Sequence, residues 1–297
     1  MRQRARVPPR PHVPAELRHE AFRGSVVVRS GLLTADQLRS QAWVRLFPDV
    51  YVHRVVGVTH QLRARAAAGL LFPDAVVTGR SAAVLWGVDM ATPTDDVELT
   101  VRSGAHPVRV PGLRVRRASV DERDVCRRTG VRVTTPEATA VALARALPLE
   151  DAVVAVDQLT QNGLAALSLV RALAETATGP GARRARQACA LADGRAESPQ
   201  ETRLRLLVAR SDLPAPVAQL TVRDGARFVA RVDFGWPAQR VALEYDGLWH
   251  GEPGQFARDR ERLNRLQAAG WRVVFVTAAD LRRPEQLIAR IADALDR

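Results

Sequence analysis

Between residues 217 and 246, hydrophobic and polar residues alternate with the two-residue period of β-strands. The pattern predicts three strands, over 217–223, 227–234 and 240–246, with Asp224-Gly225 as a hairpin turn. The alternation gathers hydrophobic residues of the second and third strands on one face: Val232, Phe234, Val241, Leu243 and Tyr245. The opposite face receives three acidic residues: Asp233, Glu244 and Asp246. Neighbouring like charges repel, so stability does not account for this cluster.

Helix signals surround these strands. The capping box Ser198-Pro199-Gln200-Glu201, with proline at the first helical position, predicts a helix that ends near residue 210. The pattern also predicts a helix over 254–269 that Gly270 ends, a buried strand over 271–277 and an amphipathic helix over 280–295. Residues 197–297 therefore have the predicted order α-β-β-β-α-β-α.

Upstream of residue 197 the pattern is less regular. A capping box at 34–37 and a strand-like run at 43–52 predict helix, turn, helix and a β-wing over 15–58. The section over 59–195 combines predicted helices with strands in 96–118, where Pro111-Gly112 is a turn. We therefore expect an α+β multidomain protein with these parts: a disordered basic tail (1–14), a winged-helix-like module (15–58), an α+β middle domain (59–195) and a C-terminal αβββαβ domain (197–297).

The composition is strongly basic. The 44 basic residues, all of them arginine, exceed the 32 acidic residues and give a net charge of +12. This balance favours nucleic acid or another polyanion as a partner. The absence of lysine excludes a Walker-type phosphate loop, a Schiff base and a lysine nucleophile.

Two cysteines are too few for a disulfide scaffold or a zinc site, and we expect both to be reduced thiols. No apolar run approaches the ~20 residues that span a bilayer, and the first residues lack the hydrophobic core of a signal peptide. We expect a cytoplasmic protein.

The acidic face of the predicted hairpin suggests metal chemistry. Carboxylates that converge are the ligands by which a protein holds Mg²⁺ or Mn²⁺ against a phosphate, and Asp233, Glu244 and Asp246 are the candidate ligands. His250 is a candidate general acid or base, because its ordinary pKa near 6.5 suits proton transfer. A solvated strand edge remains the alternative for the carboxylates, as does an ordinary loop histidine for His250.

Several residues are candidates for nucleic-acid contact. Arginine can clamp a phosphate and Trp249 can stack on an unpaired base. The alternatives are surface salt bridges, a solvated face and core packing. The candidate arginines are Arg258 and Arg262 in the predicted helix over 254–269, and Arg183, Arg184 and Arg186 after Gly179-Pro180-Gly181.

The order and spacing of Asp233, Glu244-Tyr245-Asp246-Gly247, His250, Asp259-x-x-Arg262 and Gly270-Trp271 resemble the very-short-patch-repair (Vsr-like) endonucleases of the PD-(D/E)XK superfamily. This resemblance covers about 197–297 and implies a restriction-endonuclease-like domain that binds Mg²⁺. It also implies that Glu201 completes the metal shell, although the capping role is an alternative. Most superfamily members have lysine where this chain has Asp246, so the role of that lysine must pass to another group or be lost.

Residues 15–58 resemble the winged-helix domain of AbiEi-type antitoxins, with Asp49 in the place of the family's glycine. The two resemblances together imply a metal-dependent DNA endonuclease with an N-terminal DNA-binding module. The alternatives are a non-enzymatic, antitoxin-type DNA-binding regulator with a degenerate nuclease fold, and an interaction protein with no nucleic-acid role. A toxin or defence-system partner is a further expectation, and the oligomeric state stays open.

Overall fold

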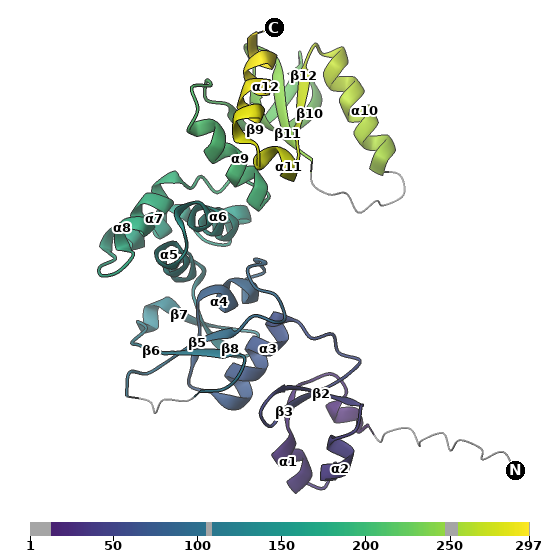
Figure 1. Cartoon of the computed structure of the whole chain (residues 1–297), viewed down its shortest axis with the longest axis vertical. Coiled ribbons are helices and arrows are strands. Elements are labelled where there is room, and N and C mark those ends of the chain that lie inside the picture. Colours follow the sequence, from purple (N-terminus) through teal and green to yellow (C-terminus); the bar gives the residue numbers. More distant parts are fainter. Residues whose placement is uncertain (1–12, 105–108, 247–254, 297) are drawn as a thin grey trace, which may run out of the picture. The chain divides into compact units, whose positions relative to one another are not determined.

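The structure of the protein is a computed structural model that describes residues 13–104, 109–246 and 255–296, with the backbone alone at 162 and 255–259. The chain divides into two compact units, Met1–Thr139 and Ala140–Arg297. This division falls inside the predicted middle domain rather than at its ends. Each unit combines helices with β-sheet, so the predicted α+β multidomain class is confirmed (Figure 1).

A small module with a three-stranded antiparallel sheet in the order β1-β3-β2 opens the first unit. The predicted capping box is confirmed, because the Thr34 hydroxyl accepts a hydrogen bond from Gln37 N–H while the Gln37 side chain accepts one from Thr34 N–H. A core of Phe22, Trp43 and their neighbours fills the module. Its elements are η1 (Ala15–Leu17), β1 (Phe22–Arg23), α1 (Gly24–Arg29), α2 (Ala35–Leu38), β2 (Trp43–Phe47) and β3 (Val50–His53).

Asp49 forms the turn between β2 and β3 in place of a glycine. Its φ is 61°, in the left-handed region that aspartate tolerates better than most residues. The Asp49 carboxylate accepts hydrogen bonds from the backbone N–H and hydroxyl of Ser25 and from Arg23 Nε. These bonds fix the turn, so the hairpin forms without glycine.

A five-stranded mixed sheet in the order β6-β5-β4-β8-β7 forms the rest of the first unit. Because β5 and β6 are parallel, Pro111-Gly112 leads into β6 and does not join two antiparallel strands. The elements are α3 (His60–Ala66), η2 (Ala67–Leu71), β4 (Val76–Val77), α4 (Gly79–Leu85), β5 (Val97–Val101), β6 (Leu113–Arg117), η3 (Glu122–Asp124), β7 (Val125–Arg128) and β8 (Val131–Thr134).

A buried histidine connects α3 to α4 in this unit. His60 Nδ1 lies 3.0 Å from the Thr92 carbonyl oxygen, and Nε2 lies 2.8 Å from Ser81 Oγ. The carbonyl only accepts, so Nδ1 carries the hydrogen and the Ser81 hydroxyl donates to Nε2. Ser81 Oγ also accepts from Glu98 N–H. His60 is therefore neutral with both ring nitrogens paired.

The second unit begins with helices. α5 starts in the first unit and continues into the second, and the predicted helices of this region are all present. The set is α5 (Pro136–Ala146), α6 (Leu149–Thr160), η4 (Gln161–Gly163), α7 (Leu167–Thr176) and α8 (Ala182–Leu191).

A four-stranded sheet with the order β12-β11-β10-β9 completes the second unit. β9, β10 and β11 are antiparallel neighbours, and β12 is parallel to β11. The order of elements matches the sequence prediction, and Gly270 ends α10 with a left-handed φ of 74°. The elements are α9 (Pro199–Ala209), β9 (Val217–Asp224), β10 (Arg227–Trp236), β11 (Val241–Tyr245), α10 (Gln255–Ala268), β12 (Arg272–Val276), α11 (Ala278–Leu281) and α12 (Pro284–Asp296).

Helices cover both faces of this sheet. Figure 1 shows α10 on the opposite side from α9 and α12. Phe234 and Leu243 pack with α9 and α12, as the predicted alternation requires, but Val232 packs with Ala242 under α10. The regular alternation therefore does not extend over both residues, and on the neighbouring strand Gln219 has a left-handed φ of 52°.

Two further predictions about this region were wrong. β12 is not a buried strand: it lies at an end of the described sheet, and Phe275 is 40% exposed. The predicted helix over 280–295 is divided into α11 and α12, because Pro284 starts a new helix. None of the helices in the described ranges has the length and apolar character needed to cross a membrane.

Candidate active site

Asp233 and Glu244 lie on the adjacent strands β10 and β11. The paired register of these strands runs from Trp236–Val241 to Phe234–Leu243, and each acid is the next residue of its strand beyond the last paired position. Tyr245 N–H donates to Asp233 Oδ2 over 2.8 Å, so β11 holds the Asp233 carboxylate. The sheet therefore brings two of the predicted ligands together.

The Asp233 carboxylate is an unfavourable charge in this fold. Burial raises its pKa above the ordinary value, and the nearby negative charge of Glu197 raises it further. The Tyr245 N–H and the positive charges of Arg262 and Arg231 act in the opposite direction. The net effect is a raised pKa, so the surroundings oppose ionised Asp233.

Glu201 joins Asp233 from the first turn of α9. Burial raises the pKa of the Glu201 carboxyl, and the charge of Asp233 also raises it. The predicted capping box is present in part: Ser198 Oγ accepts from Glu201 N–H, but Glu201 Oε2 accepts from Glu197 N–H and not from the N-cap residue Ser198. Since Glu201 also interacts with Asp233, the cap does not exclude a role in the site.

Gln219 is a site residue that the sequence analysis missed. Its Nε2 donates to Glu201 Oε2 over 3.1 Å, and its backbone has the left-handed φ noted above. Non-glycine residues with such a φ concentrate at functional sites, where the surrounding structure holds the strain. No pattern in the sequence indicates this conformation.

Glu244 forms a two-pronged ion pair with Arg262 of α10. Both Nη atoms of Arg262 donate to the two carboxylate oxygens of Glu244. The Glu244 side chain is only 7% exposed, whereas the Arg262 side chain is 30% exposed. A guanidinium thus lies against one of the predicted metal ligands, with part of its surface open to solvent.

Asp246 was predicted as a third ligand, but the described structure does not group it with Asp233 and Glu244. It is exposed at the end of β11, where its N–H donates to the Val276 carbonyl. Among the residues that the structure describes, no group of three or more His, Cys, Asp or Glu side chains is arranged to hold a metal ion. Glu244 is bound to Arg262, and the remaining close carboxylates are Asp233 and Glu201.

The other predicted site residues divide into two sets. His250 and Trp249 lie outside the described residues, as does the side chain of Arg258. Arg184 donates to the Arg145 and Leu147 carbonyls, at the end of α5.

Arg186 donates to the Ala177 carbonyl at the end of α7, while Arg183 is exposed. Two of the three arginines therefore stabilise helix C-termini, where cations are favourable.

A second buried carboxylate lies among the helices of this unit. Asp157 Oδ1 accepts from Asp193 N–H and Gly194 N–H, and Oδ2 accepts from the Thr202 hydroxyl and Arg205 Nη2. The side chain is 0% exposed. The sequence signal was an acidic residue inside the apolar run of α6, which the analysis passed over. Two of the four bonds join α6 to α9, and the other two join α6 to the segment at 193–194 that follows α8.

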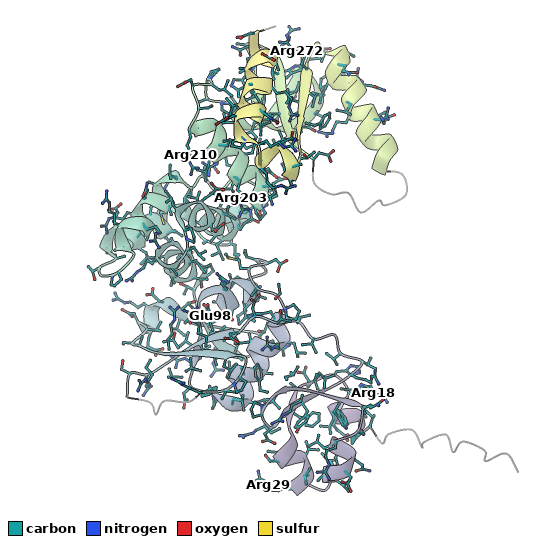
Figure 2. All side chains as sticks on the ribbon, in the orientation of Figure 1. Arg18, Arg29, Glu98, Arg203, Arg210 and Arg272 are labelled. Atoms are coloured by element: carbon teal, nitrogen blue, oxygen red, sulfur yellow. The ribbon has the colours of Figure 1, made fainter. Side chains whose placement is uncertain are left out.

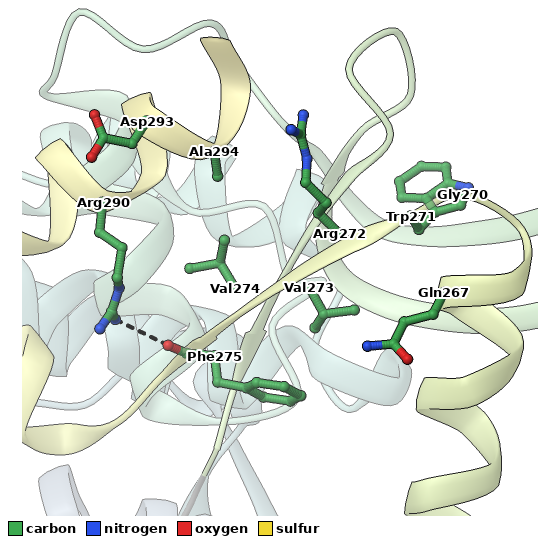
Figure 3. A pocket seen from close by; sticks show the side chains of 10 residues that line it. All are labelled: Gln267, Gly270, Trp271, Arg272, Val273, Val274, Phe275, Arg290, Asp293 and Ala294. Atoms are coloured by element: carbon green, nitrogen blue, oxygen red, sulfur yellow. Dashed lines mark hydrogen bonds between the residues drawn. The ribbon is translucent and has the colours of Figure 1, made fainter. Parts of the chain in front are cut away.

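A hollow lies at the outer edge of β12, away from these carboxylates. Figure 3 shows Trp271, Phe275 and Arg290 among its lining residues, with Arg290 donating to the Phe275 carbonyl over 3.0 Å. None of its lining residues belongs to the group of Glu201, Asp233 and Glu244. We therefore place the candidate site on β10 and β11.

The Glu201, Asp233 and Glu244 side chains provide oxygen atoms, the ligand type of a hard divalent cation, although the described residues contain no group of three that is arranged to hold one. Two observations describe the charge at this place. Burial and mutual repulsion disfavour the ionised forms of Asp233 and Glu201, which a cation would reverse. Arg262 already places a positive group on Glu244, in the position of a stand-in cation.

The fold and this group of acids define a multidomain α+β protein with a buried carboxylate cluster. The chain is 34% identical over 270 residues to Uncharacterized protein Rv2248 of Mycobacterium tuberculosis strain H37Rv and to Uncharacterized protein MT2308 of strain CDC 1551. Each alignment covers 88% of this chain and 95% of the relative. The chain therefore belongs to the family of these mycobacterial proteins.

No protein-family model matches the chain. Among solved structures, the chain is similar to the crystal structure of the RV2827C protein from Mycobacterium tuberculosis, with a TM-score of 0.40 and 14% identity. That match covers 69% of this chain and 84% of the other.

Proposed function

We propose that the protein is a metal-dependent DNA endonuclease of the PD-(D/E)XK type, with its active site at Asp233, Glu244 and Glu201. The observation that carries this proposal is the raised pKa of two carboxyls, half-buried Asp233 and buried Glu201, together with the buried Glu244 carboxylate on the strand adjacent to that of Asp233. Such a group opposes stability and is a feature of functional sites. The α-β-β-β-α-β order around it supports the proposed fold.

Asp233 and Glu244 would hold Mg²⁺ or Mn²⁺, with Glu201 as the next oxygen donor. A divalent cation at this position supplies positive charge that favours ionisation of water and offsets the charge that develops on a phosphate. The chain's own residues orient the substrate: the Arg262 guanidinium is suited to two phosphate oxygens. A raised pKa also suits Glu201 as a proton acceptor.

The N-terminal module supports DNA as the substrate. Its order η1-β1-α1-α2-β2-β3 contains two consecutive helices followed by a hairpin, which is the proposed winged-helix plan of AbiEi-type domains. Arg18 and Arg29 are exposed on it, and Figure 2 shows both side chains. The net charge of +12 favours a polyanion generally.

Cleavage of plasmid DNA tests the enzymatic proposal. The full chain is incubated with supercoiled plasmid and Mg²⁺ or Mn²⁺, beside Asp233→Ala and the control variant Asp212→Ala, which changes an exposed aspartate in the same unit. We expect nicking by the wild type and by Asp212→Ala, and at least a hundredfold loss in Asp233→Ala. Equal activity in all three proteins would identify a contaminating nuclease and reject the proposal.

An antitoxin-type DNA-binding regulator is the second candidate. The observation in its favour is that Arg262 holds Glu244 and that the described residues contain no three-ligand metal group. It predicts a DNA gel shift that weakens with salt but neither cleavage nor binding of Mn²⁺. Isothermal titration with Mn²⁺ separates the candidates, because only a nuclease site requires metal affinity that depends on Asp233.

A further inference from the structure

We propose that the outer edge of β12 is a dimer interface, at which the β12 strands of two copies of the chain pair antiparallel and join their sheets. The inference concerns the second unit alone and does not depend on the proposed function. It gives a role to the hollow of about 770 Å³ along this edge, which residues of β12, α10 and α12 line (Figure 3).

The backbone of β12 directs two residues away from the sheet. Arg272 N–H donates to the Arg240 carbonyl, so Arg272 points toward β11. In a parallel pair, alternate residues of a strand bond to the same neighbour, so Val273 and Phe275 point to the outer edge. Arg290 of α12 agrees with this direction, because it donates to the Phe275 carbonyl (Figure 3). The edge therefore offers the N–H and C=O groups of Val273 and Phe275 to a further strand.

Two copies of β12 can satisfy these groups for each other. A two-fold axis at Val274 places Val273 of each copy opposite Phe275 of the other. Each such pair exchanges two N–H···O bonds, as the hydrogen-bonded pairs of an antiparallel ladder do. The Phe275 carbonyl has two lone pairs, so it can accept from the second copy and keep its bond from Arg290. The two outward residues thus find their partners in a copy of the same strand.

The two ends of the sheet differ in how they are protected from pairing. At one end, β9 contains the left-handed Gln219 and finishes with the charged residues Arg223 and Asp224. Such irregularities and charges discourage pairing at an edge. At the other end, β12 reads Arg-Val-Val-Phe-Val, with no proline and a single charge at its start, and Phe275 is 40% exposed. An apolar edge without protection is a surface that a partner strand covers.

The charges along the hollow favour a second copy over a foreign peptide. Arg290 is already paired with Asp280 over 3.1 Å. Arg272 and the exposed Asp293 also line the hollow, and neither forms an ion pair with another residue in the described ranges. An acidic segment would meet Asp293 and a basic segment would meet Arg272. A two-fold interface instead lets Arg272 of each copy face Asp293 of the other.

The oligomeric state of the full chain tests the proposal, with sedimentation velocity over a range of concentrations as the measurement. Phe275→Arg places a charge at the proposed interface. Phe228→Arg is the matched control, because Phe228 is a 54% exposed phenylalanine on β10 of the same sheet. We expect the wild type to dimerise, Phe275→Arg to raise the dissociation constant of the dimer at least tenfold, and Phe228→Arg to leave it unchanged.

Val273→Pro is a second variant of the edge. The Val273 N–H points away from β11, so proline removes a donor of the interface and leaves the β11–β12 ladder intact. We expect a dissociation constant at least tenfold above that of the wild type, with the far-ultraviolet circular dichroism of a folded protein.

A mixing experiment tests whether the partner is a second copy with reciprocal charges. Arg272→Asp alone and Asp293→Arg alone each bring like charges together across the axis and should weaken the dimer. An equimolar mixture of the two variants restores opposite charges at both contacts, so it should dimerise more tightly than either variant alone. A mixture no better than its components would overturn the reciprocal pairing.

Three results of the sedimentation experiment would overturn the interface. The first is a wild type that stays monomeric up to ~100 μM, above the micromolar constants of weak interfaces of ordinary size. The second is a dimer whose dissociation constant is unchanged in both Phe275→Arg and Val273→Pro. The third is an equal rise in Phe228→Arg and Phe275→Arg, which would show that the effect is not specific to the β12 edge.

Discussion

Two carboxylates in the second unit, buried Asp157 and half-buried Asp233, have opposite relations to their surroundings. Asp157 accepts four hydrogen bonds, one of them from Arg205, at donor–acceptor distances of 2.7–2.9 Å. Asp233 is held by the Tyr245 N–H, and burial together with nearby negative charge raises its pKa. The Asp157 carboxylate stabilises the packing of the helices, whereas the ionised Asp233 carboxylate lowers the stability of the fold.

The difference shows how a structural acid is distinguished from a functional one. A buried charge is tolerated when donors and a counter-ion satisfy it, as at Asp157. Where acids gather with too few donors, as at Asp233 and Glu201, the fold has a reason beyond stability to keep them. The sign of the stability change on mutation is therefore the sharpest test.

The largest effect is expected at Asp157. Asp157→Ala removes all four acceptor contacts and one of the two carboxylates that pair with Arg205, the other being Asp193, so we expect a loss of about 3–5 kcal/mol in the free energy of unfolding. Urea denaturation measures it, and hydrogen exchange should show faster exchange in α6 and α9. The control, Asp212→Ala, should change stability by less than about 0.5 kcal/mol. A loss no larger than that of the control would show that the Asp157 carboxylate does not stabilise the fold.

His60 extends the comparison to the first unit, as a buried group with all partners present. Burial lowers its pKa below 6.5. Neutral His60 therefore contributes stability that is complete above about pH 6.5 and is lost as the pH falls through the lowered pKa. Ser81→Ala leaves Nε2 and Glu98 N–H without a partner and should cost about 1–3 kcal/mol. Denaturation of the first unit against pH, compared with His60→Gln, checks both expectations. A pH slope that survives in His60→Gln must come from another group.

Asp233→Asn should change stability in the opposite direction. The variant keeps an acceptor for Tyr245 N–H but removes the disfavoured charge, so we expect a gain of about 0.5–2 kcal/mol at pH 7. A raised pKa means that the penalty in the wild type is present above that pKa and disappears as the pH falls below the ordinary value of 3.8. The gain should accordingly vanish at low pH, and saturating Mn²⁺ should reduce it. If Asp233→Asn instead lowers the stability at pH 7, Asp233 has a structural role like that of Asp157.

The smallest effect is expected for the arginines of α8. Arg184→Ala and Arg186→Ala each lose bonds to carbonyls at helix ends and should cost about 0.5–1 kcal/mol. Arg183→Ala should leave the melting temperature unchanged because Arg183 is exposed. Thermal unfolding of the three variants provides the measurement. A DNA affinity that falls in Arg183→Ala alone would assign phosphate contact to this residue.

The sequence predicted those features that depend on local signals. The capping box at Thr34, the N-cap hydrogen bond of Ser198 and the three strands over 217–246 appear where expected, because each signal acts within a few residues. The same alternation predicted that Asp233 and Glu244 lie on adjacent strands, as they do on β10 and β11. Their role as metal ligands stays a prediction.

What the sequence did not predict depends on contacts between distant residues. The Glu244–Arg262 pair joins a strand to a helix 18 positions away, and the Asp157 network spans 48 positions to Arg205. No periodic pattern encodes such pairs. The edge position of β12 was missed for a similar reason: an apolar run of five residues indicates a strand but not its place in the sheet.

Helix α9 serves two neighbours at once. Thr202 and Arg205 face the carboxylate of Asp157, while Leu204 and Val208 fill the core beneath the C-terminal sheet. An excised C-terminal third that starts at residue 197 would leave the first pair without its partner and strip one side of the helix. Autonomous folding is therefore to be sought in a longer piece, beginning near residue 140.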